Sequence, residues 1–263
     1  MKKLLLGLLG IMLTATFTPT VAKAADDWQF AVTPYLWGAG IDGTVKIKGH
    51  EADFSKPFDE IIKDLDLAGM LNLQVRKGRF GAYTDVMYLG TSDSTSVLNP
   101  ATGATLADVS TSLDQWLIDF GASWAVAQWG AGGAGSKGVV DLFLGGRYWN
   151  LTTEFTAKSP FFAGELGVEK TADWVDPIVG ARFAVDFTPK LLLIGRGDVG
   201  GFDLGGSISK LTWSASACLG WRFTPLLSAY AGWKYLSVER ESDRGATIDL
   251  ALSGPVLGLA FTF

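Results

Sequence analysis

The sequence predicts an all-β protein, a transmembrane antiparallel up-and-down β-barrel of about ten strands. Three observations favour this class: an export leader at the amino end, apolar residues that alternate with polar ones, and a last strand that ends on Phe263. The chain is 48% hydrophobic, yet no segment after residue 24 approaches the ~20 apolar residues that a spanning helix needs. Because only helices and closed barrels satisfy every backbone amide in a bilayer, this apolar surface points to strands.

Residues 1–24 have the three parts of a secretory signal peptide. Lys2-Lys3 gives a basic start, Leu4–Leu13 is an apolar run, and Ala22-Lys23-Ala24 supplies the small residues of a cleavage site. The apolar run is too short for an uncleaved membrane anchor. We therefore expect a mature barrel domain over residues 25–263, located in the cell outer membrane.

Charge and cysteine content exclude several classes of function. Cleavage would remove three of the 22 basic residues and no acid, which leaves a net charge of −8. This charge argues against a nucleic-acid partner, because phosphate binding needs a positive surface. The single cysteine, Cys218, cannot form an intrachain disulfide and cannot build a cysteine-rich zinc site. We expect no metal and no cofactor.

Alternation with a period of two assigns the strands. In Asp114–Val126 and Lys210–Phe223, apolar residues alternate with polar or small ones, as expected when one face meets lipid and the other meets a polar lumen. The count of ten returns both ends to the periplasm; eight strands follow if two weak segments are loops, and twelve if Ile41–Lys48 pairs within the barrel. The ten expected strands are Trp28–Trp37, Gly69–Lys77, Phe80–Gly90, Leu113–Val126, Val139–Leu151, Ala172–Phe187, Leu191–Gly201, Leu211–Phe223, Leu227–Val238 and Ala246–Phe263.

The connections alternate in length, as they do in outer-membrane barrels with short periplasmic turns and long outer loops. The short ones are Arg76–Arg79, Thr188–Lys190 and Thr224-Pro225, and the long polar ones are Gly38–Ala68, Thr91–Ser112 and Thr152–Thr171. The glycine-rich stretch Gln128–Gly138 is long where a short turn is expected. Within the first long connection, Ser55–Asp66 places Pro57 before apolar residues at helical spacing. It predicts a short amphipathic helix that caps the barrel mouth or lies on the membrane surface.

The last strand suggests how the barrel is assembled. Leu257, Leu259, Phe261 and Phe263 alternate, and the chain ends on the aromatic. This ending resembles the signal recognised by the bacterial barrel-assembly machinery; the alternative is a sandwich edge strand that happens to end in Phe. We expect that machinery, outer-membrane lipids and lipopolysaccharide as partners, and the oligomeric state stays open.

Several motifs resemble a set of uncharacterised proteobacterial outer-membrane β-barrel proteins. The similarity spans most of the mature chain and implies an outer-membrane barrel, but it brings no established activity and no functional residues. The motifs that carry it are Trp28 with Pro34-Tyr35-Leu36-Trp37-Gly38 and Gly43, Arg76-Lys77-Gly78-Arg79-Phe80-Gly81, Gly146-Arg147-Tyr148-Trp149, the stretch Trp174–Phe183, and Gly197-Asp198-Val199-Gly200-Gly201-Phe202.

Alternation also leaves a set of charged residues on the faces assigned to the lumen. A charge on the lipid face costs ~2–4 kcal/mol near the midplane, so inward placement is expected. Inside, nearly equal numbers of acids and bases can pair, which gives either a salt-bridged plug or the lining of a pore. The expected lumen residues are Arg76, Asp85, Asp119, Asp141, Arg147, Asp176, Arg182, Arg196, Asp198, Arg222 and Lys234.

Three functions remain open at this point. The first is a narrow passive channel or small-solute permeation protein, and the second is a closed barrel that serves envelope integrity or surface interaction. The third, an outer-membrane hydrolase, has little support because the only histidine, His50, lies in the first long connection. Gly38-x-Gly40-x-x-Gly43 matches a dinucleotide fingerprint but opens no helix. We expect no catalytic residues and no enzyme activity.

Overall fold

The computed structural model describes residues 27–47, 50–98, 105–130, 137–158, 165–205, 208–241 and 247–263. The expected signal peptide and most of the glycine-rich stretch lie outside these ranges. The strands are β1 (Trp28–Trp37), β2 (Gly40–Ile47), β3 (His50–Lys56), β4 (Leu65–Lys77), β5 (Phe80–Leu98), β6 (Thr105–Trp129), β7 (Lys137–Lys158), β8 (Glu165–Asp186), β9 (Leu191–Gly201), β10 (Leu211–Arg222), β11 (Leu227–Glu241) and β12 (Thr247–Thr262), and one helical turn, α2, covers Phe58–Ile61.

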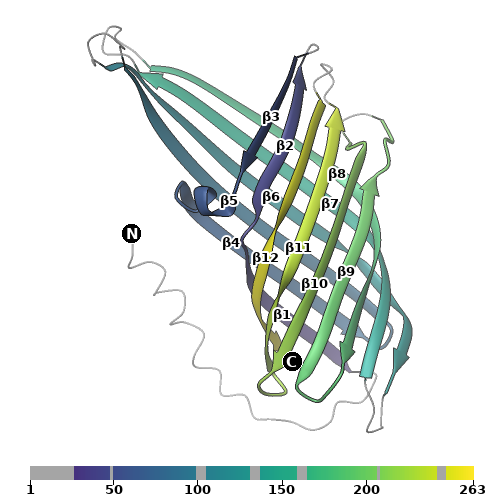
Figure 1. Cartoon of the computed structure of the whole chain (residues 1–263). Helices are drawn as coiled ribbons and strands as arrows, with labels where there is room; N and C mark the ends of the chain where they lie inside the picture. Colours follow the sequence, from purple (N-terminus) through teal and green to yellow (C-terminus); the bar gives the residue numbers. More distant parts are fainter. Residues whose placement is uncertain are drawn as a thin grey trace.

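Ten of these strands close into an antiparallel barrel, which confirms the predicted fold. Consecutive strands pair from β4 to β12, and β1 joins β4 on one side and β12 on the other. The closing contact puts Ala31 opposite Thr262 and Trp37 opposite Val256. In Figure 1 the short turns and the carboxyl end lie at the lower end of the barrel. Short turns mark the periplasmic end of an outer-membrane barrel.

β2 and β3 lie outside the closed ring. β2 pairs with β12 beyond the point where β1 stops, from Gly40 opposite Ser253 to Lys46 opposite Thr247. β3 pairs with β2 in turn and stands at the edge of the sheet. The segment that would have given a twelve-stranded barrel therefore extends the wall above the ring instead.

The two other long connections were expected to be loops, and this expectation is wrong for most of their length. β5 and β6 stay paired out to Leu98 and Thr105, and β7 and β8 stay paired out to Lys158 and Glu165. In Figure 1 these four strands run to the upper left as one long paired arm, beside β2 and β3. Their outer faces carry serine, threonine and charged residues, so their pattern suits water and lacks the apolar face of a spanning strand.

The predicted helix in Ser55–Asp66 is present as a single turn, shorter than expected. Its Phe58 ring packs on the backbone of Gly38, and Ile61 is buried. After the turn, the backbone oxygen of Asp64 accepts a hydrogen bond from Ser92, and the Asp64 carboxylate accepts one from Lys56, which raises the Lys56 pKa. These contacts fix the turn against β3 and β5, at the base of the extension.

The outer surface of the ring carries the apolar side chains, and its inner face carries the polar ones. On β10, Trp213, Leu219 and Trp221 are exposed, whereas the intervening Thr212 and Ser214 are buried. An apolar exterior with aromatic residues and a polar interior is the pattern of a membrane-spanning barrel. In the described part of the chain, no helix has both the length and the apolarity to cross a membrane.

Candidate functional site

The structure places all eleven predicted lumen residues inside the barrel, at several heights. Four of them form a central cluster: Asp119, Arg147, Arg196 and Asp198. Arg76, Asp141 and Arg182 form a lower cluster nearer the periplasmic end. Asp85 faces Lys234 in a third contact, while Asp176 stands apart from these pairs, and Arg222 pairs with Asp186 near the periplasmic rim.

The central cluster is a closed array of two guanidinium groups and two carboxylates. Arg147 donates from Nε to Asp119 Oδ1 at 2.8 Å and from Nη2 to Asp119 Oδ2 and Asp198 Oδ1 at 2.9 Å each. Arg196 donates to Asp119 Oδ2 at 2.8 Å and to Asp198 Oδ2 at 3.1 Å. Arg147 is only 1% exposed. A buried charge is tolerated only where it is paired and hydrogen-bonded, and this array meets that condition.

Neutral side chains complete the central cluster. Thr212 accepts from Arg147 Nη1 at 3.1 Å, and Ser214 donates to Asp198 Oδ2 at 2.6 Å. The guanidinium carbon of Arg196 lies 5.0 Å from the ring centroid of Tyr83 and 4.8 Å from that of Phe143. Cation–π contacts of this length stabilise a desolvated guanidinium. The cluster is thus held from strands on opposite sides of the barrel.

The lower cluster centres on one carboxylate shared by two arginines. Asp141 Oδ2 accepts from Arg76 and, at 2.7 Å, from Arg182. Arg182 also donates to Gln74 at 2.6 Å. Asp141 Oδ1 and Arg76 Nη1 are buried and make no hydrogen bond within the described part of the chain. This cluster is less fully bonded than the central one.

Lys234 has the loosest ion pair among the lumen cations. Its Nζ lies 3.8 Å from Asp85 Oδ2, beyond hydrogen-bond distance, while Asp85 Oδ1 accepts from Tyr35 at 2.8 Å. The ammonium also lies 4.7 Å from the ring centroid of Trp37 and 5.6 Å from that of Tyr35. Among the described residues it makes no hydrogen bond, so its three donors are free.

Asp176 departs from the expectation that lumen acids pair with lumen bases. It is fully buried, and every donor that reaches it from the described residues is uncharged. Trp149 and Trp174 donate their indole N–H groups at 3.0 and 3.1 Å. Ser209 donates both its backbone N–H and its hydroxyl at 2.8 Å. Hydrogen bonds from these neutral donors take the place of a cation, and those from Ser209 fasten the β9–β10 connection to the barrel wall.

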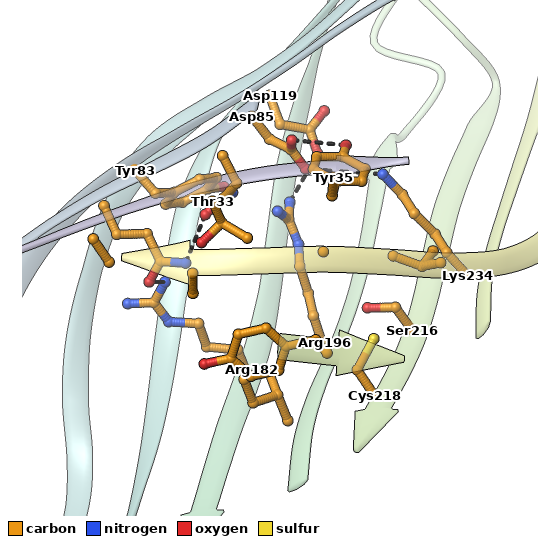
Figure 2. A pocket seen from close by; sticks show the side chains of 18 of the residues that line it. Thr33, Tyr35, Tyr83, Asp85, Asp119, Arg182, Arg196, Ser216, Cys218 and Lys234 are labelled. Atoms are coloured by element: carbon orange, nitrogen blue, oxygen red, sulfur yellow. Dashed lines mark hydrogen bonds and ion pairs between the residues drawn. The ribbon is translucent and has the colours of Figure 1, made fainter. Parts of the chain in front are cut away.

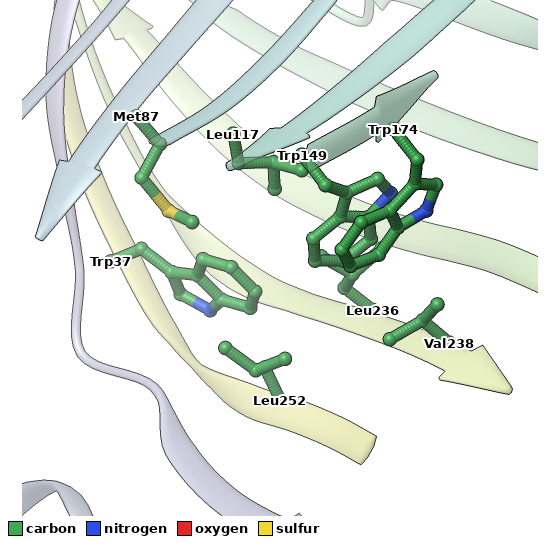
Figure 3. Close-up of a cluster of buried hydrophobic side chains, with 8 residues drawn as sticks. All are labelled: Trp37, Met87, Leu117, Trp149, Trp174, Leu236, Val238 and Leu252. Atoms are coloured by element: carbon green, nitrogen blue, oxygen red, sulfur yellow. The ribbon is translucent and has the colours of Figure 1, made fainter. Parts of the chain in front are cut away.

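Above the central cluster, the lumen is filled by an apolar plug. Figure 3 shows Trp149 and Trp174 side by side. Their ring planes are 11° apart and their ring centroids are 5.4 Å apart. Leu236, 1% exposed, lies beside them on the same inner surface. The plug consists of Trp37, Met87, Leu117, Trp149, Trp174, Leu236, Val238 and Leu252.

Below the central cluster lies a cavity of about 280 Å³ (Figure 2). Its lining runs from Asp85 and Asp119 at mid-height to Thr262, the last residue of β12, so it faces the periplasmic end. Arg182, Arg196 and Lys234 are its cations. A second void of only about 10 Å³ lies between the cavity and the plug. Four residues line both this void and the cavity: Tyr35, Asp85, Asp119 and Lys234.

Sequence reasoning missed the indole side chains of the lumen. Trp149 follows Arg147 by two residues, and Trp174 precedes Asp176 by two, so the same alternation places both indoles inside. The lumen candidates were charged and polar side chains, and the tryptophans were left out. The role of Ser209 had no such signal, because it follows β9 and its contact depends on how that connection folds. His50 begins β3 in the extension, and its side chain lies outside the described part.

Comparison with known proteins finds similarity only among solved structures. No family model and no curated protein matches this chain. The outer-membrane protease OmpT from Escherichia coli is 11% identical, with a TM-score of 0.49 over 93% of this chain and 99% of that one. The attachment invasion locus protein Ail of Yersinia pestis, in complex with a heparin analogue, is 12% identical, with a TM-score of 0.35 over 90% and 99%.

The toluene transporter TodX of P. putida is also similar, at 11% identity and a TM-score of 0.27 over 91% of this chain and 90% of that one. These structures include a protease, an attachment protein and a transporter, so the resemblance selects no function. The fold assignment stands on the strand pairing of this chain itself.

Proposed function

We propose that this chain is a closed outer-membrane barrel whose work is done at the surface and in the envelope, without free passage of solutes in the resting state. The observation that carries the proposal is the central cluster, in which Arg147 binds Asp119 and Asp198 at mid-height with almost no exposed surface. The apolar plug lies directly above it. A ten-stranded barrel is close to the size at which side chains fill the interior.

The projecting strands support a role outside the membrane. β5 to β8 continue past the spanning region, and the outer face of that part carries polar residues such as Ser110. Their inner face exposes apolar side chains, with Phe155 at 44%, Val168 at 54% and Leu166 at 78%. A barrel that only spans the membrane would need no such extension, so the surface that contacts partners outside the membrane lies on these strands.

Single-channel recording in planar bilayers tests the closed state. The purified full-length barrel is expected to give no discrete openings at moderate voltage, because solutes would have to cross both the central cluster and the plug. Regular openings in the unmodified protein would overturn the proposal. Heat-dependent gel mobility of the protein recovered from the bilayer lipid shows that a silent barrel is folded and inserted.

A narrow conduit for small solutes is the second candidate. One observation favours it: the cavity and the small void above it share Tyr35, Asp85, Asp119 and Lys234, so a shift of the loosely bound Lys234 would join them. Lys234→Ala is then expected to raise conductance while the control Lys210→Ala does not. Silence of both variants favours the closed barrel.

We propose in addition that the barrel is noncatalytic and resides in the outer membrane. Partners follow from the surface: lipid and lipopolysaccharide around the apolar band, and the barrel-assembly machinery at Phe263, which is 40% exposed at the periplasmic end. Deletion of Phe263 is expected to lower the amount of assembled barrel in membranes, measured by heat-dependent gel mobility. An unchanged amount would remove the assembly signal.

A further inference from the structure

The lumen cavity that faces the periplasm has more cations than carboxylates. Arg182, Arg196 and Lys234 line it against Asp85 and Asp119. Both oxygens of Asp119 are already bound by arginines, and Asp85 Oδ1 is bound by Tyr35. With the groups that pair with them (Arg76, Arg147, Asp141 and Asp198), these side chains comprise five cations and four carboxylates, a formal excess of one positive charge.

Lys234 is the cavity cation with the most unused hydrogen-bond donors among the described residues. The Nη2 of Arg196 and the Nε and both Nη atoms of Arg182 are engaged with protein oxygens, whereas the Lys234 ammonium has no hydrogen bond within the described residues. An ammonium has three donors and prefers an oxyanion. Ser216 lies directly across from Lys234 in the β10–β11 pair and adds a hydroxyl to the same wall.

One part of the wall is small and apolar, while polar and aromatic side chains such as Gln74 and Tyr83 line another part. Ala31, Val256, Gly258, Ala260 and Ile194 line the cavity below Lys234. A volume of about 280 Å³ is near the lower end of the ~300–1,000 Å³ typical of ligand sites. The site has room for one small molecule with an apolar body and one charged end.

We infer that this cavity binds a small organic carboxylate that reaches it from the periplasm, with the carboxylate on Lys234 and Ser216 and the apolar body along β12. Access from the opposite side is closed by the central cluster and the apolar plug. The inference goes beyond the proposed function, since a closed barrel needs no ligand.

Cys218 supplies the reporter, because it lines the same cavity and is the only cysteine in the chain. It follows Ser216 by two residues on the inner face of β10. A methanethiosulfonate reagent transfers its organic thio group to the Cys218 thiolate: the new disulfide forms, the reagent's sulfur–sulfur bond breaks, and methanesulfinate leaves. The reaction rate therefore reports how readily each reagent enters the cavity.

The first measurement compares an anionic reagent, sulfonatoethyl methanethiosulfonate, with a cationic one, trimethylammonioethyl methanethiosulfonate. Intact mass follows the reaction of the full chain in detergent, and each rate is divided by that of the same chain unfolded in urea. We expect the normalised anionic rate to exceed the cationic one about tenfold, because the reagent approaches an incompletely paired cation. Equal rates, a cationic preference or an unreactive Cys218 would overturn the inference.

Charge variants identify the residue responsible. Lys234→Gln is expected to abolish the anionic preference, and Lys234→Arg to keep it. Lys210→Gln is the matched control, because Lys210 carries the same charge and pairs with Glu241 outside the cavity. Heat-dependent gel mobility shows that each variant is folded. A preference that persists in folded Lys234→Gln contradicts the assignment.

Competition tests binding itself. Benzoate at millimolar concentration is expected to slow modification of Cys218 at least about twofold in the unmodified protein, whereas benzamide, its neutral counterpart, does not. In Lys234→Gln the two compounds should act alike. If benzoate gives no protection, the cavity attracts anions without holding them, and the binding site is disproved.

Discussion

Arg147 and Asp119 form a two-point contact inside the barrel, with Nε to Oδ1 at 2.8 Å and Nη2 to Oδ2 at 2.9 Å. The two residues stand opposite each other on β6 and β7, where the ladder pairs them directly. A fork-to-fork geometry fixes both side chains as well as binding them. The same guanidinium group reaches Asp198 on β9 and Thr212 on β10, so one residue joins four strands across the lumen.

Removal of the Arg147 guanidinium should lower the stability of the barrel strongly. Arg147→Met leaves Asp119 and Asp198 with Arg196 as their remaining cation, and the expected loss is about 3–5 kcal/mol in the free energy of unfolding. Urea unfolding of the barrel folded into lipid vesicles measures it. Lys46→Met, which breaks an exposed pair with Glu51, should cost less than about 1 kcal/mol. Equal losses of unfolding free energy in the two variants would contradict a larger contribution from the buried cluster than from an exposed ion pair.

Asp176→Asn should loosen the β9–β10 connection without unfolding the barrel. The variant replaces one acceptor oxygen with a donor that faces indole and hydroxyl donors, at an expected cost of about 1–3 kcal/mol. The near-ultraviolet circular dichroism of Trp149 and Trp174 should weaken, and protease should cut the connection more readily. Asp173→Asn, on the exposed face of the same strand, is the control and should change neither signal.

Gly145 tolerates no side chain, because a Cβ there would overlap the backbone oxygen of Phe120. Gly145→Ala is expected to destabilise the barrel by about 1–3 kcal/mol or more, since neither strand can move without breaking the ladder. At Gly69 a Cβ meets no atom within 4 Å, so Gly69→Ala should be tolerated. The amount of assembled barrel recovered from membranes compares the two. Normal recovery of Gly145→Ala would mean that the β6–β7 spacing is not as close as described.

Leu144 tests which surface meets the hydrocarbon. It is 68% exposed on the outer face of β7, so Leu144→Arg should cost about 2–4 kcal/mol in lipid vesicles. Ser110→Arg places the same charge on the outer face of the projecting part of β6 and should cost little, because that face meets water. A similar effect of both substitutions would contradict the membrane boundary drawn from the apolar band.

Alternation was enough to separate the two faces of the barrel. Trp213 and Thr212 are adjacent in sequence, and their opposite exposures follow directly from a period of two. The closing strand Trp28–Trp37 was predicted with the bounds that the structure gives. The projecting parts of β5 to β8 were missed because apolar residues alternate with polar ones only along the part of each strand that lies in lipid.

Partner choice inside the lumen could not be predicted in this way. Arg147 and Asp198 are 51 residues apart, and their contact depends on barrel diameter and stagger as well as on the face of each strand. The uncharged environment of Asp176 was equally hidden, because Ser209 reaches it from a connection with no periodic pattern. Sequence patterns therefore indicated which residues enter the lumen, and the three-dimensional fold decided which of them meet.

The rim of the barrel is notched where β9 stops short of β8. The ladder between β8 and β9 ends at Ile178 opposite Gly200, while β8 itself begins at Glu165. A bare strand edge of this kind is a template for aggregation unless something blocks it. Pro177 stands one residue past the end of the ladder, and Lys170 and Asp173 lie farther along the same edge. Proline and charges at a free edge hinder the addition of a strand from another copy, so the notch discourages barrels from zipping together in a crowded membrane.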